Sequence, residues 1–285
     1  MAGRYILVLS CADRPGIVAA VAGHIAASRG NITESSQFND PDTDRFFLRT
    51  VFDLADEADA PAMRAGFDRL AADYGMTLSL RAASLRPRVL ILVSKFDHCL
   101  VDLLYRQRTG ELDMDVAGII SNHDLAALGN PDFGSIPFHH LPVTAATKAA
   151  QEAQLLQLVE DSRADLVVLA RYMQILSDNL AASLSGRCIN IHHSFLPSFK
   201  GARPYHQAHD RGVKLIGATA HYVTADLDEG PIIEQDVERI SHADTPDDLV
   251  RKGRDIERRV LARAVALHLD GRVLMNGRRT VVFRN

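Results

Sequence analysis

Apolar positions in the first third of the chain alternate in some segments and recur with a helical period in others. Runs such as residues 4–11 (RYILVLSC) are typical of strands, and the stretch that Pro15 and Gly16 open is typical of an amphipathic helix. The predicted strands and helices follow one another at residues 4–11, 15–30, 32–38, 44–54, 58–75 and 76–83. Their order, βαββαβ, predicts a ferredoxin-like domain.

A seam interrupted by proline separates this region from the rest of the chain. The segment Ser84–Val89 (SLRPRV) contains Pro87, and a new apolar strand begins directly after it. Proline and its restricted predecessor interrupt regular structure, so a domain boundary is expected here. We therefore predict an N-terminal domain over residues 1–84 and a second domain over residues 88–285.

From residue 89 onward, apolar strand-like runs alternate with helical stretches. The strands are predicted at 89–94, 115–121, 165–170 and 188–192, and the helices at 99–109, 145–162 and 177–184. This alternation predicts an α/β fold with a doubly wound, mostly parallel, Rossmann-like sheet, in which ligands bind beyond the carboxyl ends of the strands. We expect the helix Pro246–Leu269 and two tail strands to complete this domain.

Composition limits the classes of ligand and partner. With 285 residues, 47% hydrophobic and 24% charged, the chain can bury a core. A net charge of -4 gives no positive field for nucleic acid or an anionic membrane surface, so neither is expected as a partner. Cys11, Cys99 and Cys188 are widely spaced, which argues against a disulfide framework or a zinc ribbon. No segment reaches membrane-spanning length, and we predict a cytoplasmic protein with a small-molecule ligand.

Polar side chains gather where one buried strand ends. In Cys188–His192 (CINIH), Asn190 and His192 point to the same face because residues two apart in a strand do so. A carboxylate from the polar loop that holds Asp226 and Asp228 can reach His192. An amide beside an imidazole and a carboxylate suits attack on a carbonyl group. The alternative is that these groups only satisfy backbone groups at the strand end.

The surrounding motif resembles a known catalytic signature. NIHHSFLPSFKG, followed by LDEGPIIEQ, is similar to the signature of the folate-dependent formyltransferase and hydrolase family. The resemblance assigns the catalytic trio to Asn190, His192 and Asp228. It also implies folate contacts from LARYMQILS and from the loop after Tyr222, with the candidates Met173, Gln174, Ile175, Leu176, His193, Val223, Thr224 and Ala225. Gln174 stands where transferases commonly carry arginine.

The resemblance implies a reaction as well as a site. Members of this family that join an ACT domain to the catalytic domain hydrolyse 10-formyltetrahydrofolate to formate and tetrahydrofolate. The folate is then the substrate, and no cofactor is expected. Whether the formate would feed purine synthesis or a catabolic folate cycle stays open.

Formyl transfer and non-catalytic folate sensing are the alternatives to hydrolysis. Formyl transfer to an amine such as a glycinamide ribonucleotide needs a phosphate cradle, whereas Lys95–Leu104, after the first strand, contains no glycine. The relative that formylates an initiator tRNA carries an additional domain, which we do not expect in a chain that ends at Asn285. A folate-responsive regulator without catalysis has no need for the intact trio.

Several polar residues have two possible roles each. His193 either lines the water site or packs, and Lys95, Asp97 and His98 either form a solvated loop or shape the site. Five further histidines lack the spacing of a zinc site, and we predict structural or surface positions for them and no metal: His139, His140, His206, His209 and His221.

The N-terminal domain resembles the ACT family through DRPGIVAAVAGHIAASRGNI. ACT domains usually pair edge to edge and bind an amino acid at the shared interface. The resemblance therefore implies a homo-oligomer and an amino-acid effector, with the candidate contacts Asp13, Arg14, Gly16, Ile17 and Asn31. A domain that serves assembly alone is the alternative. RNA binding is not expected, because the aromatic and basic strand motif of such modules is missing.

Overall fold

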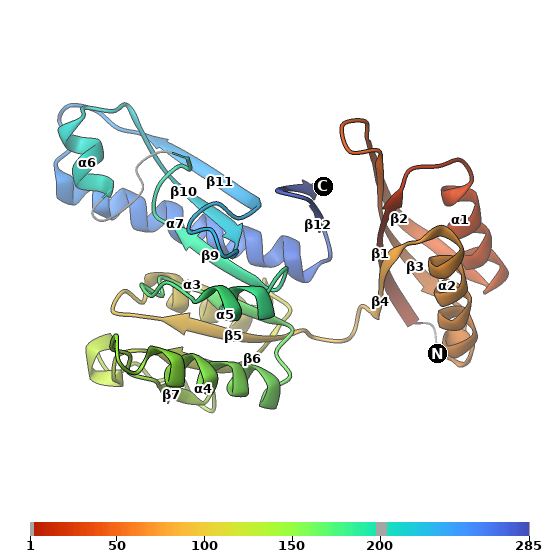
Figure 1. The fold of residues 1–285 in the computed structure, drawn as a ribbon, viewed down its shortest axis with the longest axis horizontal. Coiled ribbons are helices and arrows are strands. Elements are labelled where there is room, and N and C mark those ends of the chain that lie inside the picture. The colour runs from red at the N-terminus through yellow and green to blue at the C-terminus, as the bar shows by residue number, and fades with distance from the viewer. Residues whose placement is uncertain (1–2, 198–203, 285) are drawn as a thin grey trace. The chain divides into compact units, whose positions relative to one another are not determined.

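The computed structural model describes residues 3–197 and 204–284, and its contacts divide the chain into two units (Figure 1). The N-terminal unit contains Met1–Arg86 together with Asp270–Asn276 and Thr280–Asn285. The second unit contains Pro87–Leu269 and Gly277–Arg279. The part of the catalytic motif at residues 198–203 lies outside the described residues.

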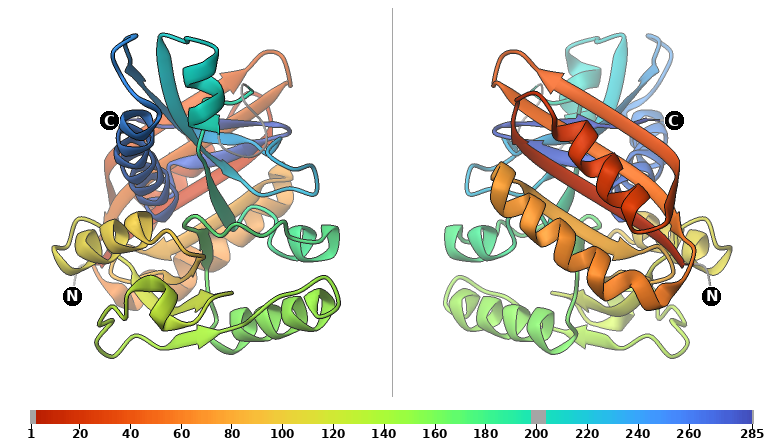
Figure 2. Two further views of the ribbon diagram at one scale, coloured as in Figure 1. Left: turned by 90° about the vertical axis from the view of Figure 1, so that its left-hand side faces the viewer. Right: turned by 90° about the vertical axis from the view of Figure 1, so that its right-hand side faces the viewer.

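A four-stranded antiparallel sheet forms the N-terminal unit, with strand order β2-β3-β1-β4. Its elements are β1 (Gly3–Ala12), α1 (Ile17–Ala27), β2 (Gly30–Asp40), β3 (Arg45–Leu54), the short 3₁₀ helix η1 (Glu57–Asp59), α2 (Ala60–Tyr74) and β4 (Thr77–Ala82). Figure 2 shows α1 and α2 side by side on one face of this sheet. The predicted ferredoxin-like order is confirmed.

Apolar residues at helical spacing hold α1 and α2 on the sheet. Ile17, Val21 and Ile25 of α1 are buried, as are Met63 and Phe67 of α2. The spacing of four residues places each set on one helix face, so both helices cover the apolar side of the sheet. Burial of each such side chain stabilises the fold by about 1.5–3 kcal/mol.

The opposite face of the sheet is covered by the end of the chain. The hairpin of β12 (Val273–Asn276) and β13 (Arg279–Val282) brings Leu274 and Phe283 against Phe47 of β3. Neighbouring residues of β3 point to opposite faces, so Phe47 cannot reach the helices and needs this cover. We expected the tail strands in the second domain, whereas their contacts group most of them with the N-terminal unit.

The second unit is built on a seven-stranded sheet of order β11-β10-β9-β8-β5-β6-β7. Its elements are β5 (Arg88–Val93), α3 (His98–Arg108), β6 (Asp115–Ser121), η2 (Leu125–Leu128), β7 (Phe138–His140), α4 (Lys148–Asp161), β8 (Leu166–Leu169), α5 (Asp178–Ser183), β9 (Cys188–His192), α6 (Pro204–Asp210), β10 (Leu215–Tyr222), β11 (Ile232–Arg239) and α7 (Pro246–Leu269). Neighbouring strands pair in parallel from β7 through β6, β5 and β8 to β9. The strand β10 pairs antiparallel with both of its neighbours, β9 and β11. The predicted mostly parallel α/β domain is confirmed.

The strand order places a ligand site by its topology. The chain moves from β5 through β6 to β7 and then returns to β8 on the other side of β5. Ligands bind at the carboxyl ends of strands beside such a reversal. The segments that leave β8 and β9 at this end are residues 170–177 and 193–197. In the described part of the chain, no helix combines the length and the apolar character that a membrane crossing requires.

Candidate active site

The candidate site begins with two side chains at the end of β9. Asn190 and His192 lie on one face of this strand, between the neighbouring strands β8 and β10. The loop after β10 brings Asp228 to the same place. Its Oδ1 lies 3.2 Å from Nδ1 of His192, and the two side chains are only 12% and 6% exposed. The three residues that the sequence singled out therefore share one site.

A tight turn holds the Asp228 carboxylate at this position. A Cβ atom on Gly230 would lie 1.7 Å from the carbonyl oxygen of Tyr222, so only glycine permits this approach. The N–H of Tyr222 donates to the carbonyl of Pro231, which closes the loop at its base. Asp228 itself has a φ of 57°. Aspartate tolerates this left-handed conformation better than most residues, and such conformations cluster at functional sites.

The neighbouring imidazoles set the charge of Asp228. Burial raises the pKa of its carboxyl group, but the hydrogen bond from His192 and the charges of the nearby histidines outweigh burial and lower the pKa overall. The carboxylate therefore stays ionised over the physiological pH range and can hold a positive charge on His192.

Asn190 has a second neighbour that the sequence analysis did not recognise. His221 of β10 lies directly opposite Asn190 in the strand register, and its Nε2 is 3.2 Å from Nδ2 of Asn190. Nδ1 of His221 donates to the carbonyl oxygen of Tyr222 at 2.9 Å. The sequence predicts a structural or surface position for His221. Its pairing with Asn190 follows from the antiparallel register of β9 and β10, which the sequence pattern did not reveal.

These side chains line a cavity of about 310 Å³. Nε2 of His192 is buried and has no hydrogen-bond partner among the described residues. All the predicted folate contacts line the same cavity: Met173, Gln174, Ile175, Leu176, His193, Val223, Thr224 and Ala225. Leu169, Arg171, Tyr172, Ile191, Asp226 and Leu227 complete the lining together with the residues above. The cavity has the size of a small-molecule site.

Hydrogen bonds fix the backbone of the segment that forms one wall. The hydroxyl of Ser94, at the end of β5, accepts from the N–H of Met173, and the N–H of Ser94 donates to the carbonyl of Arg171. Ser177 caps the first turn of α5 by accepting from the N–H of Leu180. Between these two anchors, Met173 and Ile175 expose about half of their surface or more, at 52% and 60%. They offer apolar contact area for a flat ligand.

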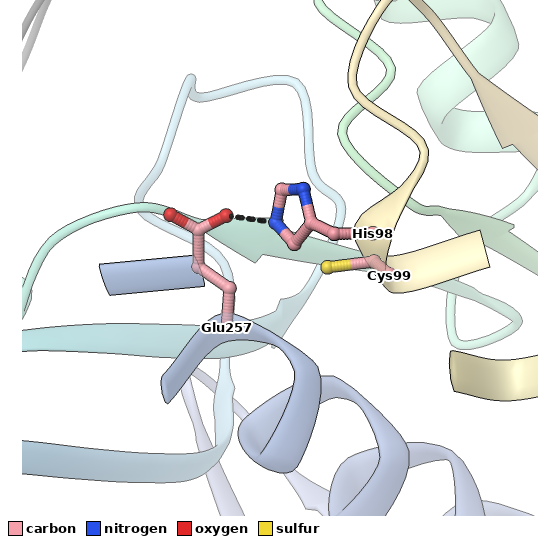
Figure 3. Close-up of side chains that lie close together, drawn as sticks. All are labelled: His98, Cys99 and Glu257. Atoms are coloured by element: carbon pink, nitrogen blue, oxygen red, sulfur yellow. Dashed lines mark hydrogen bonds and ion pairs between the residues drawn. The ribbon is translucent and has the colours of Figure 1, made fainter. Parts of the chain in front are cut away.

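A buried carboxylate contacts Tyr205, whose ring centroid lies 6.4 Å from that of His193. Glu257 of α7 accepts from Nε2 of His98 at 2.8 Å (Figure 3). It also accepts from the hydroxyl of Tyr205 at 2.7 Å, and Nε of Arg171 lies 3.4 Å away. Burial, followed by the positive charge of Arg171, lowers the pKa of His193 to about 3. His193 is therefore neutral where it stacks on His192, with ring centroids 5.2 Å apart.

The same cluster is the place where a metal ion has to be considered. Among the described residues, only His98, Cys99 and Glu257 bring three potential ligand atoms within 4.8 Å of one another. Both oxygens of Glu257 are already in hydrogen bonds, and the Arg171 cation repels a further cation. Burial raises the pKa of the Cys99 thiol well above its usual range, which keeps it protonated. These contacts are those of a hydrogen-bonded carboxylate.

The other histidines considered for metal binding lie apart from this site. His139 and His140 belong to the edge strand β7, and His206 and His209 belong to α6. His98 is 14% exposed and donates to Glu257, so it is not part of a solvated loop. Lys95 and Asp97 precede it in an open loop.

The N-terminal unit contains a second cavity, at the start of α1. Asp13, Arg14, Gly16 and Ile17 line it, and these are four of the five candidate effector contacts. Gly16 has a φ of 94°, which favours glycine at the turn into α1. Asn31 pairs with Asp53 at the other end of β2 and does not line this cavity. Gln37, Asn39 and Phe46 contribute instead, together with Val18, Ala19 and Ala22.

Comparison with known proteins assigns both units to families. Residues 87–265 match the family described as Formyl transferase, and residues 5–65 match the ACT domain. A formyltetrahydrofolate deformylase from Corynebacterium sp. (strain P-1) is 50% identical over 288 residues, which cover 99% of this chain and 98% of the relative.

Solved structures give the same result. A formyltetrahydrofolate deformylase from Burkholderia mallei superposes with a TM-score of 0.93 at 53% identity, covering 99% of this chain and 100% of the other. A glycinamide ribonucleotide transformylase from Symbiobacterium toebii reaches a TM-score of 0.66 at 32% identity, covering 72% of this chain and 98% of the other. The similarity to deformylases spans both units.

Proposed function

Because the chain belongs to the formyltetrahydrofolate deformylase family, we infer that it hydrolyses 10-formyltetrahydrofolate to formate and tetrahydrofolate. The relatives that carry this activity in their names match almost the whole chain, including the ACT domain. The substrate carries the formyl group itself, so the reaction needs only water as a second reactant.

The position of His192 between Asp228 and the cavity carries this proposal. Nδ1 of His192 donates to Asp228, 3.2 Å away, so its Nε2 offers a lone pair to a water molecule in the cavity. As the water oxygen bonds to the formyl carbon, Nε2 takes one of its protons. Asp228 stabilises the imidazolium that forms.

The second half of the reaction returns this proton. The N–H of Asn190 stabilises the negative oxygen of the tetrahedral intermediate. When the bond between the formyl carbon and nitrogen breaks, His192 donates its proton to the departing nitrogen, and formate is released. We propose that the pterin lies against the backbone of residues 173–176 and the loop of residues 223–228, where exposed apolar side chains provide contact area.

Formyl transfer to an amine is the competing reaction. One group of structural neighbours is named for it, at lower similarity and with 72% of this chain covered. A phosphorylated acceptor needs backbone N–H groups in a tight turn after β5. The turn here, residues 94–97, contains no glycine. This absence supports water as the acceptor.

One assay separates the alternatives. Purified protein is incubated with 10-formyltetrahydrofolate, with and without glycinamide ribonucleotide, while formate, tetrahydrofolate and formylated acceptor are measured. Formate release without the acceptor supports the deformylase. Formylated acceptor alone supports the transferase, and folate binding without turnover supports a regulator.

A single substitution tests the catalytic assignment. Asp228→Asn should lower turnover by about 10²–10⁴-fold with folate affinity largely kept, because a positioned acid or base is lost. Asp210→Asn is the matched control, since Asp210 also neighbours a histidine, His209, but is 81% exposed. An Asp228→Asn enzyme with wild-type turnover would rule out this mechanism.

We further propose that the N-terminal unit binds an amino acid and pairs with a second copy. The support is its membership of the ACT family and the cavity at Asp13, Arg14, Gly16 and Ile17. Calorimetric titration with amino acids, combined with analytical ultracentrifugation, tests both parts. A cytoplasmic location is proposed because all three cysteines are free and buried.

A further inference from the structure

His221 contacts both the amide and the carboxylate of the catalytic trio. Its side chain is 3% exposed, and Nε2 lies 3.2 Å from Nδ2 of Asn190 and 3.8 Å from Oδ1 of Asp228. The other ring nitrogen, Nδ1, lies 2.9 Å from the backbone carbonyl oxygen of Tyr222. All of these contacts are within one sheet and its adjoining loop, in the second unit.

The carbonyl of Tyr222 decides which nitrogen of His221 carries the proton. A carbonyl oxygen only accepts hydrogen bonds, so Nδ1 must carry the hydrogen. In a neutral imidazole the lone pair is then at Nε2, which faces Asn190. Burial lowers the pKa of His221 and so favours this neutral form.

The lone pair at Nε2 in turn decides the orientation of the Asn190 amide. The oxygen and nitrogen of an amide have nearly the same shape, and only their hydrogen-bond partners distinguish them. Oδ1 facing Nε2 would bring two acceptors together. Nδ2 therefore faces His221 and donates one of its two hydrogens, which leaves the second N–H of the same nitrogen for a ligand in the cavity.

We propose that His221 is a positioning residue for deformylation, whose single tautomer orients Asn190 so that an N–H and not the carbonyl oxygen meets the formyl oxygen. This proposal rests on the proposed function of Asn190 as the oxyanion donor. A neutral His221 also leaves the charge of Asp228 available to His192. The fixed backbone carbonyl of Tyr222 thus sets the tautomer of His221, and this tautomer sets which group of Asn190 faces the reacting oxygen.

Two substitutions at His221 separate positioning from packing. Glutamine places its terminal amide near the position of Nε2 and can accept from Asn190, whereas asparagine places its amide near Nδ1 and cannot. His221→Asn should lower kcat by about 10- to 100-fold, a part of the effect of losing a whole oxyanion donor. KM should stay within about twofold of wild type, and His221→Gln should keep kcat within about fivefold.

A double-mutant cycle tests whether His221 acts through Asn190. If it does, His221→Asn should cost less than about threefold in an Asn190→Ala background. Equal losses of kcat in His221→Asn and His221→Gln would overturn the proposal. The full loss of kcat from His221→Asn, repeated in the Asn190→Ala background, would overturn it as well. Circular dichroism of each variant verifies that it is folded.

A measurement on the unmodified protein covers the case in which a variant does not fold. In ¹⁵N-histidine NMR spectra of the unmodified protein at neutral pH, with the His221 signals assigned by triple-resonance experiments, His221 should show a protonated Nδ1 and an unprotonated Nε2. A protonated Nε2 contradicts the proposal. The NMR experiment determines the tautomer without substrate, so its result does not depend on turnover. A protein that releases no formate would refute the proposed function, whereas a protonated Nε2 would refute the role of His221.

Discussion

His193 makes the folded state sensitive to mild acid. Burial and the charge of Arg171 lower its pKa to about 3, against 6.5 for an ordinary histidine. Between these two values the unfolded chain binds a proton that the folded protein does not, so the free energy of unfolding falls as the pH falls. We therefore expect stability to decrease from pH 7 to pH 5, and less so in His193→Gln.

Burial also lowers the pKa of His221, so the contribution of His193 is the difference between the wild-type slope and the slope of His193→Gln in this pH range. The carboxyl groups of Asp228 and Glu257 have lowered pKa values, and their contributions are lost only at a pH below their ordinary values of 3.8 and 4.5. Urea unfolding followed by circular dichroism at several pH values provides the measurement. His209→Gln, at a histidine with a 41% exposed side chain, should keep the wild-type slope. A wild-type slope in His193→Gln as well would contradict this account of His193.

Helix α7 presents a glycine where Tyr205 packs. A Cβ atom on Gly253 would lie 2.1 Å from Cζ and 2.3 Å from the hydroxyl oxygen of Tyr205, whose hydroxyl donates to Glu257. Gly253→Ala must push the ring away from the carboxylate. We expect a loss of about 1–3 kcal/mol in the free energy of unfolding, as for other overpacked cores.

Gly23 of α1 is the matched control for this substitution. It is exposed, and a Cβ atom there would have no neighbour within 4 Å. Gly23→Ala should raise the free energy of unfolding by about 0.5–1 kcal/mol, because alanine loses less conformational freedom in a helix than glycine does. Circular dichroism during urea unfolding measures both variants, since the chain contains no tryptophan. The two substitutions should change the free energy of unfolding in opposite directions. No change in this free energy for Gly253→Ala would mean that Tyr205 moves freely.

The long periodic elements were predictable from the sequence, and the short ones were not. Residues 246–269 form α7 with the predicted bounds, because apolar and charged positions alternate at helical spacing over its whole length. The edge strand β7 has three residues, too few to establish a period. The proximity of Asn190, His192 and Asp228 was predictable from their motif.

Contacts that depend on strand register or on distant segments could not be predicted. His221 meets Asn190 only because β9 and β10 pair antiparallel with these two residues opposite each other. Glu257 meets His98 although 159 positions separate them in the sequence. Asn31 was assigned from motif resemblance, and the direction of β2 carries it away from the cavity at Asp13.

At the scale of the whole molecule, the N-terminal unit is completed by the last residues of the chain. Arg49 has a side chain only 2% exposed and pairs with Asp270 at 2.8 Å, just after α7 ends. Glu34 of β2 pairs with the same guanidinium at 2.7 Å, so Asp270 adds a second partner from the C-terminal segment to this buried charge. The N-terminal sheet can therefore reach its full stability only after the whole chain has been synthesised.

Leu274 of β12 provides the test of this dependence. It is 6% exposed and contacts the cluster of Phe47 and Phe283, so Leu274→Ala should cost about 2–5 kcal/mol. Met275, its neighbour on the same strand, is 39% exposed, and Met275→Ala should change stability by less than about 0.5 kcal/mol. Hydrogen exchange read by mass spectrometry should show faster exchange in β3 for Leu274→Ala only, with β9 unchanged. Equal protection of β3 in both variants would mean that the hairpin does not stabilise the N-terminal sheet.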